Sequence, residues 1–205
     1  MQKIMFNDRC ALTYAVIDEI KNNTRRIEGG KQFQLAATAA EDFTYEEATG
    51  CIVMCCQGIE IFRHKCRYKV GEIVAVAQSY EQVYRQGNMD ADDAIIRGLK
   101  YDPGMCNKMY VRAALMPHQI RIMGIRCERL QDISDEECMK EGVVDVTYFK
   151  TGGRPYELFA LPGHEHEETF NTPRQAFAAL IDKVSGRGTW KSNPWVVVYE
   201  FELVK

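Results

Sequence analysis

The sequence predicts an α+β fold built on a small β-barrel whose ends are closed by helices. Apolar extended segments are interrupted irregularly by two or three amphipathic helices, unlike the regular strand–helix alternation of a doubly wound sheet. The chain has 205 residues, of which 46% are hydrophobic and 27% are charged, a composition typical of globular proteins. A chain of this length buries about 70% of its unfolded surface, so it needs neither disulfides nor metals to fold.

The N-terminal residues predict a strand, a helix and a second strand. Residues 3–6 are extended and apolar, and Asp8 is a suitable N-cap for a helix with apolar residues at helical spacing as far as Lys21. Asn22–Asn23 ends this helix, because asparagine tolerates the left-handed conformation that often follows a helix. Residues 24–27 are expected to form the second strand.

No internal repeat, low-complexity segment or linker is visible, so we expect a single domain over residues 1–205. Three segments interrupt the predicted barrel and are interpreted as insertions, at about residues 31–65, 84–107 and 145–170. The first contains an Ala-rich helix and a β-hairpin, the second a short helix, and the third an irregular loop rich in Gly and Pro. Their predicted bounds are 32–40 for the helix, 51–56 and 59–67 for the hairpin, 92–99 for the short helix and 145–172 for the loop.

The other predicted elements are four strands and two helices. A capping box of Ser134 and Glu137 begins a helix that ends at Gly142, and Pro173 occupies the first turn of a second amphipathic helix. Trp195 opens the last strand, where we expect it to be mostly buried. The strands are expected at 72–77, 110–115, 119–128 and 195–203, and the second helix extends to residue 184.

Composition and charge exclude several classes of protein. Lys and Arg number 26 against 29 for Asp and Glu, a net charge of −3, which excludes a protein that is basic over its whole surface. The longest apolar run, Cys51–Cys56, is too short to cross a bilayer, so we expect no membrane association. The first residues lack the apolar run of a signal peptide, and eight cysteines suit a reducing compartment. A cytoplasmic location is therefore expected.

The common motifs for cofactors and metals are absent. There is no phosphate-binding glycine loop, no dinucleotide fingerprint and no Gly-x-Ser-x-Gly nucleophile elbow. The cysteines form no Cys-x-x-Cys pair, and Cys55 and Cys56 would point to opposite faces of a strand. We therefore predict no cofactor and no metal.

Basic residues are concentrated in the first part of the chain. Residues 1–131 carry 18 basic against 16 acidic residues, whereas residues 132–205 carry 8 against 13. This asymmetry fits either a cleft for an anionic ligand such as RNA or a nucleotide, or a solvated surface of mixed charge. The candidate nucleic-acid-binding residues are Arg25, Arg26, Lys108, His118 and Arg121, and a further basic group consists of Arg63, Lys65, Arg67 and Lys69.

Four segments, in order, give a resemblance to the ASCH-domain proteins of the PUA-like superfamily. The family opens with a strand and a helix ending in Gly-x-Lys-Thr-x-Thr followed by an arginine, and the sequence Ile-Lys-Asn-Asn-Thr-Arg-Arg is similar to it, with Glu19 in place of the usual Gly and Asn22 in place of a frequent Thr. The matching segments are Lys3–Arg26, Tyr68–Glu72, Glu128–Gly142 and Asn193–Phe201, the last resembling phage-type members.

The resemblance implies a PUA-like small β-barrel and recognition of RNA or a modified nucleoside. One bacterial branch removes the acetyl group from N4-acetylcytidine with a lysine, a threonine and a glutamate. Carried over by motif, these catalytic positions fall on Lys21, Thr24 and Glu141.

The chemistry of these three residues suits amide hydrolysis. Thr24 can attack the acetyl carbonyl, Lys21 can accept its proton if burial and neighbouring arginines lower its pKa, and Glu141 can protonate the departing amine. The alternative is a purely structural role, with Lys21 at a helix end, Thr24 in a strand and Glu141 in a last helical turn. If the three form one site, they should line one pocket with Arg26, with the charges of Lys21 and Glu141 within about 6 Å and Thr24 between them.

Three hypotheses for function follow. The first is a module that binds RNA or a modified nucleoside, and the second is an amidohydrolase acting on N4-acetylcytidine-type substrates. The third is a phage or mobile-element accessory protein whose insertions bind a protein partner.

Overall fold

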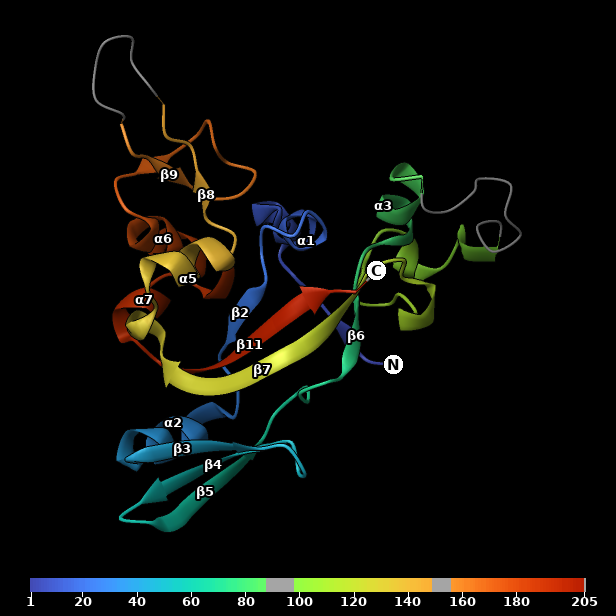
Figure 1. Cartoon of the computed structure of the whole chain (residues 1–205). Coiled ribbons are helices and arrows are strands. Elements are labelled where there is room, and N and C mark those ends of the chain that lie inside the picture. Colours follow the sequence, from blue (N-terminus) through green and yellow to red (C-terminus); the bar gives the residue numbers. More distant parts are fainter. Residues whose placement is uncertain (88–97, 149–155, 205) are drawn as a thin grey trace.

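The computed structural model describes residues 1–87, 98–148 and 156–204, and its elements are shown in Figure 1. The part of the helix expected at residues 92–97 lies outside these ranges. The α-helices are α1 Leu12–Ile17, α2 Gly30–Ala39, α3 Tyr80–Arg85, α5 Asp135–Lys140, α6 Pro173–Ser185 and α7 Thr189–Ser192. The strands are β1 Lys3–Ile4, β2 Asn23–Arg26, β3 Asp42–Glu46, β4 Cys51–Cys56, β5 Ile59–Lys65, β6 Ile73–Val76, β7 Gln119–Arg129, β8 Val144–Asp145, β9 Phe159–Ala160, β10 Thr169–Phe170 and β11 Trp195–Leu203.

The central feature is a five-stranded sheet in the order β1-β6-β7-β11-β2. β1 and β6 are parallel, and the other neighbours are antiparallel. β7 and β11 form the long middle of the sheet and curve together across the molecule (Figure 1). The mixed α+β class is therefore confirmed.

The expected small β-barrel is wrong for the described residues, because none of their sheets closes. β1 and β2 are the two edges of the central sheet, and neither has a second strand partner. The edges are linked instead by one side chain, since Nη2 of Arg26 donates a hydrogen bond of 2.9 Å to the carbonyl of Met5. A cavity, described below, lies where a barrel would have closed.

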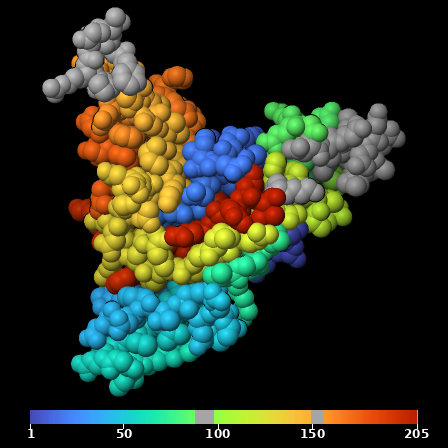
Figure 2. All heavy atoms as spheres, viewed as in Figure 1, coloured from blue at the N-terminus to red at the C-terminus, as the bar shows by residue number. Residues whose placement is uncertain are grey.

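The segment interpreted as the first insertion forms a unit of its own. Helix α2 lies against an antiparallel sheet in the order β3-β4-β5, which adds β3 to the expected hairpin. Figure 2 shows this unit, in light blue to cyan, as a lobe beside β7. Its inner face joins the main core through Phe33, Ile52 and Met54.

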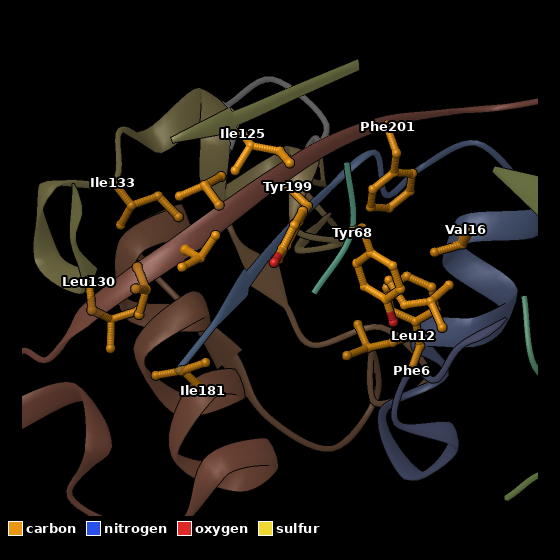
Figure 3. Close-up of a cluster of buried hydrophobic side chains, with 14 of the residues drawn as sticks. Phe6, Leu12, Val16, Tyr68, Ile125, Leu130, Ile133, Ile181, Tyr199 and Phe201 are labelled. Carbon is orange, nitrogen blue, oxygen red and sulfur yellow. The ribbon is translucent and has the colours of Figure 1, made fainter. Parts of the chain in front are cut away.

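The hydrophobic core covers both faces of the central sheet, since the consecutive residues Val196–Tyr199 of β11 are all buried. Figure 3 shows Tyr199 near its middle, with one group of side chains on either side. The buried residues of the first group include Phe6, Leu12, Val16 and Tyr68, and those of the second include Leu130, Ile133 and Ile181.

Three local predictions differ from the structure. The helix expected from Asp8 to Lys21 is split by Ala11, which has φ 48°, into a 3-10 turn and α1, and Lys21 lies beyond its end. The strand expected at 110–115 is absent. The carbonyl of Val111 accepts a hydrogen bond from Nζ of Lys3, and the segment closes with a 3-10 turn at Ala113–Leu115. Short strands β8–β10 replace part of the irregular loop expected at 145–172.

Trp195 is half-buried, which is less than expected. Its indole lies 4.6 Å from the guanidinium of Arg129 and 4.7 Å from the ring of Phe43. Its Nε1 donates a hydrogen bond of 3.2 Å to Thr38. Through Thr38 and Phe43, the side chain therefore connects α2 and β3 to the central sheet at the edge of the core.

Candidate functional site

Lys21 and Glu141, distant in sequence, meet because the turn after α1 lies against the end of α5. The amide of Asn22 donates a hydrogen bond of 3.0 Å to the carbonyl of Lys140. Gly142 ends α5 with φ 103°, and a Cβ there would lie 3.6 Å from the Cβ of Lys21. The end of α5 therefore lies over the turn at Asn22–Asn23.

The charges of Lys21 and Glu141 are in direct contact. Nζ of Lys21 lies 2.5 Å from Oε2 of Glu141 and 2.9 Å from its carbonyl oxygen, within the distance of about 6 Å expected for a shared site. The two residues are 2% and 4% exposed. Burial lowers the pKa of Lys21, and the carboxylate of Glu141 partly opposes this effect.

Arg25 extends this pair into a buried charge cluster. Its guanidinium, with no exposed side-chain surface, lies 3.0 Å from Glu141, 3.0 Å from Glu137 and 2.7 Å from Glu128. Arg126 continues the cluster by contacting Glu128, Glu137 and Glu200. Each of the three guanidinium nitrogens of Arg25 thus donates to a carboxylate, so Arg25 is not free to bind nucleic acid as predicted.

Thr24 and Arg26 line a cavity of about 360 Å³ between the two edges of the central sheet. One wall is formed by residues 5–7, after β1, and the other by residues 24–28, in and after β2, and Arg67 and the end of α6 complete the lining. The expectation that Thr24 and Arg26 share a wall is confirmed, as alternate residues of a strand point to one side.

The expected single pocket for Lys21, Thr24 and Glu141 is not present. Lys21 and Glu141 do not line this cavity, and the Thr24 hydroxyl has no hydrogen bond to either within the described residues. The ring of Phe6 lines the cavity, and its centroid lies 5.9 Å from Nζ of Lys21 and 5.7 Å from the guanidinium carbon of Arg26. The Lys21–Glu141 pair is therefore buried and does not line the cavity.

Glu28 is the cavity residue that the sequence pattern did not single out. Its Oε2 accepts a hydrogen bond of 2.9 Å from the hydroxyl of Tyr199 and lies 3.4 Å from Nε2 of His64. Burial and the nearby carboxylate raise the pKa of Tyr199, so its phenol stays protonated and donates to Glu28. Glu28 lies after β2 beside two glycines, and only its parity with Thr24 and Arg26 could have indicated its position.

Two buried polar atoms of cavity residues lack partners among the described residues. They are Nε of Arg26 and Oε1 of Glu28. The guanidinium of Arg26 lies 5.7 Å from the ring of Phe6, and its Nη2 is bound to Met5. Unpaired buried polar groups are rare in folded proteins, and they often mark a site that is completed by a water or a ligand.

The other predicted nucleic-acid-binding residues lie elsewhere. Lys108 binds the carbonyl of Phe6 and lies 2.7 Å from Asp8, so its charge is compensated. Arg121 lies in β7 and pairs with Glu202 at 2.8 Å. His118 lies in the turn before β7, and it is not without an interaction partner. None of the three lines the cavity. Arg121 is separated from β2 by β11 in the sheet order.

Comparisons of the chain with protein-family models, curated proteins and solved structures find no match. Within residues 1–87, 98–148 and 156–204, no helix has the length and apolar character needed to span a membrane. The described residues also contain no group of three or more His, Cys, Asp or Glu side chains placed to hold a metal ion. The interpretation of the site therefore depends on its own geometry.

Proposed function

We propose that this chain binds a cytidine-type nucleoside of RNA in the cavity between β1 and β2. The observation that carries the proposal is the pair of unpartnered polar atoms, Nε of Arg26 and Oε1 of Glu28, in residues of one cavity wall. Cytosine presents an N4 amino donor beside N3 and O2 acceptors, which is the complement of a carboxylate and a guanidinium. The volume of about 360 Å³ falls within the range of small-molecule sites.

The same arrangement disfavours uridine. Uracil has a carbonyl oxygen where cytosine has its amino group, so a bound uridine would direct an acceptor at the Glu28 carboxylate. N4-acetylcytidine retains one N4 hydrogen and can still donate it to Glu28. The cavity therefore predicts discrimination by hydrogen-bond polarity rather than by size.

The proposal includes a relationship to the ASCH and PUA-like proteins and a cytoplasmic location. The segment 3–26, which carries the start of the resemblance, also supplies much of both edges of the cavity. The eight cysteines are all free, as is usual in a reducing compartment. Both features support the proposal.

Calorimetric titration with cytidine, uridine and N4-acetylcytidine tests this function. Cytidine should bind at least tenfold more tightly than uridine, since a buried polar mismatch removes about 1–3 kcal/mol. Glu28→Gln should reduce that preference to less than threefold, and Glu136→Gln, which changes an exposed glutamate, should leave it unchanged. Equal binding of cytidine and uridine by the wild-type protein would contradict the proposal.

The lowered pKa of the buried Lys21 favours a second candidate, hydrolysis of N4-acetylcytidine. Thr24 would attack the acetyl carbon while Lys21, in its neutral form, accepted the hydroxyl proton. Lys21 would pass this proton to the Glu141 carboxylate it contacts, and Glu141 would give it to N4 as the N4–carbon bond broke. Water would then release acetate from Thr24. This requires Lys21 to approach Thr24, because the described residues show no hydrogen bond between the two side chains.

Chromatography of N4-acetylcytidine incubated with the protein tests the hydrolysis directly. Cytidine and acetate should accumulate with the wild-type chain, and Thr24→Val should abolish their formation while preserving the shape of the side chain. If the wild-type protein binds N4-acetylcytidine and releases no cytidine, the enzymatic candidate fails and the binding function stands.

A further inference from the structure

A second cavity of about 430 Å³ adjoins the one just described, and Arg67 lines both. It lies where the chain leaves β5 and turns toward β6. Its lining is basic, with three cationic side chains and one carboxylate. The lining residues are Gln2, Lys65, Cys66, Arg67, Lys69, Val70 and Glu72.

The three cations of this second cavity are accessible and uncompensated. Lys65, Arg67 and Lys69 are exposed, whereas the residues between them are buried, so the three lie on the solvent side of the segment. None forms a salt bridge with a carboxylate of the described residues. Arg63, by contrast, is held by Glu46 at 2.5 Å and by Glu60 at 2.9 Å. Among the described basic residues of this segment, Arg63 outside the cavity is thus paired with carboxylates, whereas the three that line the cavity are not.

The fold fixes the position of this segment against the first cavity. The amide of Arg67 donates a hydrogen bond of 3.0 Å to the hydroxyl of Tyr199, which itself donates to Glu28. The side-chain stem of Lys69 crosses Gly50, where φ is 71° and a Cβ would lie only 2.8 Å from Cγ of Lys69. A buried tyrosine and a glycine therefore hold the basic segment beside the proposed base-binding residues.

On the basis of the proposed function, we infer that the second cavity binds a phosphate group attached to the nucleoside. The preferred ligand is then a nucleotide in an RNA chain rather than a free nucleoside. Arg67 is the link, because it reaches the border of both cavities, and Lys65 and Lys69 supply the charge for the phosphate. A phosphate can come from a mononucleotide or from a strand, so the experiment contains both.

The test compares cytidine, cytidine 5′-monophosphate, cytidine 3′-monophosphate and the pentaribonucleotide UUCUU in the same titration. At least one monophosphate and the pentamer should bind at least tenfold more tightly than cytidine. The double variant Lys65→Gln, Lys69→Gln should weaken pentamer binding about tenfold without changing the affinity for cytidine. Its slope of log K against log salt should become shallower by about 1.4, as expected for two lost contacts with a single strand.

The matched control is Lys140→Gln, Lys191→Gln, which removes the same charge from two exposed lysines outside both cavities. An equal loss of pentamer affinity in this control would overturn the inference, because charge alone would then explain it. Cytidine binding with no gain from any phosphate would also overturn the inference and leave the proposed function intact. Absence of binding by every probe would refute the proposed function itself.

Discussion

Replacement of Glu141 by Gln tests whether the buried charge cluster stabilises the fold. Glu141 is the shared partner of two buried cations, with 2.5 Å to Nζ of Lys21 and 3.0 Å to Nη1 of Arg25. A glutamine can accept a hydrogen bond from only one of them and directs its own NH₂ donors at the other. Removal of one partner from a buried ion pair costs about 3–5 kcal/mol.

The cost for Glu141→Gln should lie near the lower end of that range. The carboxylate raises the pKa of Lys21, so its removal lowers this pKa further and lets the amine lose its proton instead of remaining buried with a charge. A loss of about 3 kcal/mol corresponds to a fall in Tm of roughly 6–12 °C for a chain of this size. Arg25 keeps its contacts with Glu128 and Glu137, which limits the loss on that side.

Urea and thermal unfolding followed by circular dichroism measure this effect. Glu136→Gln, in an exposed position of the same helix, should change the free energy of unfolding by less than about 0.5 kcal/mol. The double variant Lys21→Met, Glu141→Gln should recover at least about 1 kcal/mol relative to Glu141→Gln, because it also removes the buried amine that has lost its carboxylate partner. If Glu141→Gln unfolds like the wild-type protein, the cluster is not the source of stability inferred from its geometry.

Three other expected outcomes concern stability. Trp195→Ala should cost about 3 kcal/mol in urea unfolding, at the low end for a large aromatic residue because this one is half-buried; a loss below about 1 kcal/mol would contradict its role in fastening α2. Ser134→Ala removes the cap of α5 and should cost about 1 kcal/mol, whereas Ser192→Ala, in the last turn of α7, should cost less. Because burial lowers the pKa of Lys21 in the folded protein, the unfolded chain binds more protons at alkaline pH, and the free energy of unfolding should rise there with pH toward the ordinary lysine pKa. Lys21→Met should lack this contribution, so equal slopes of the free energy of unfolding against pH in the two proteins would refute it.

Local patterns in the sequence predicted the elements that depend on local interactions. The capping box of Ser134 and Glu137 and the proline of α6 appear as expected, because caps satisfy backbone groups within a few residues. The same rule would have found α3, whose capping box consists of Ser79 and Gln82. That helix begins between the strand expected at 72–77 and the insertion expected at 84–107, where no element was predicted.

Long-range features were predicted less well. The proximity of Lys21 and Glu141 followed from the family resemblance, yet nothing in the sequence indicated that neither would line the cavity with Thr24. The open sheet was also not predictable, because closure depends on whether two edge strands meet and not on the pattern within either. Unpaired cations such as Lys65 and Lys69 became distinct from their neighbours only when the partners of Arg63 were known.

The position of β2 at the edge of the central sheet has a consequence for the order of events during synthesis. Among the described residues, β11 is the one strand that pairs with β2, through contacts such as Arg26 with Val197, so the strand that carries Thr24 and Arg26 joins the sheet through residues made some 170 positions later. The opposite wall, residues 5–7, follows β1, which joins the sheet only by pairing with β6. A nascent chain released as far as residue 190 would have its early core segments but only one fixed wall of the cavity. The cavity should therefore be complete only after β11 has been made and has taken its place between β7 and β2.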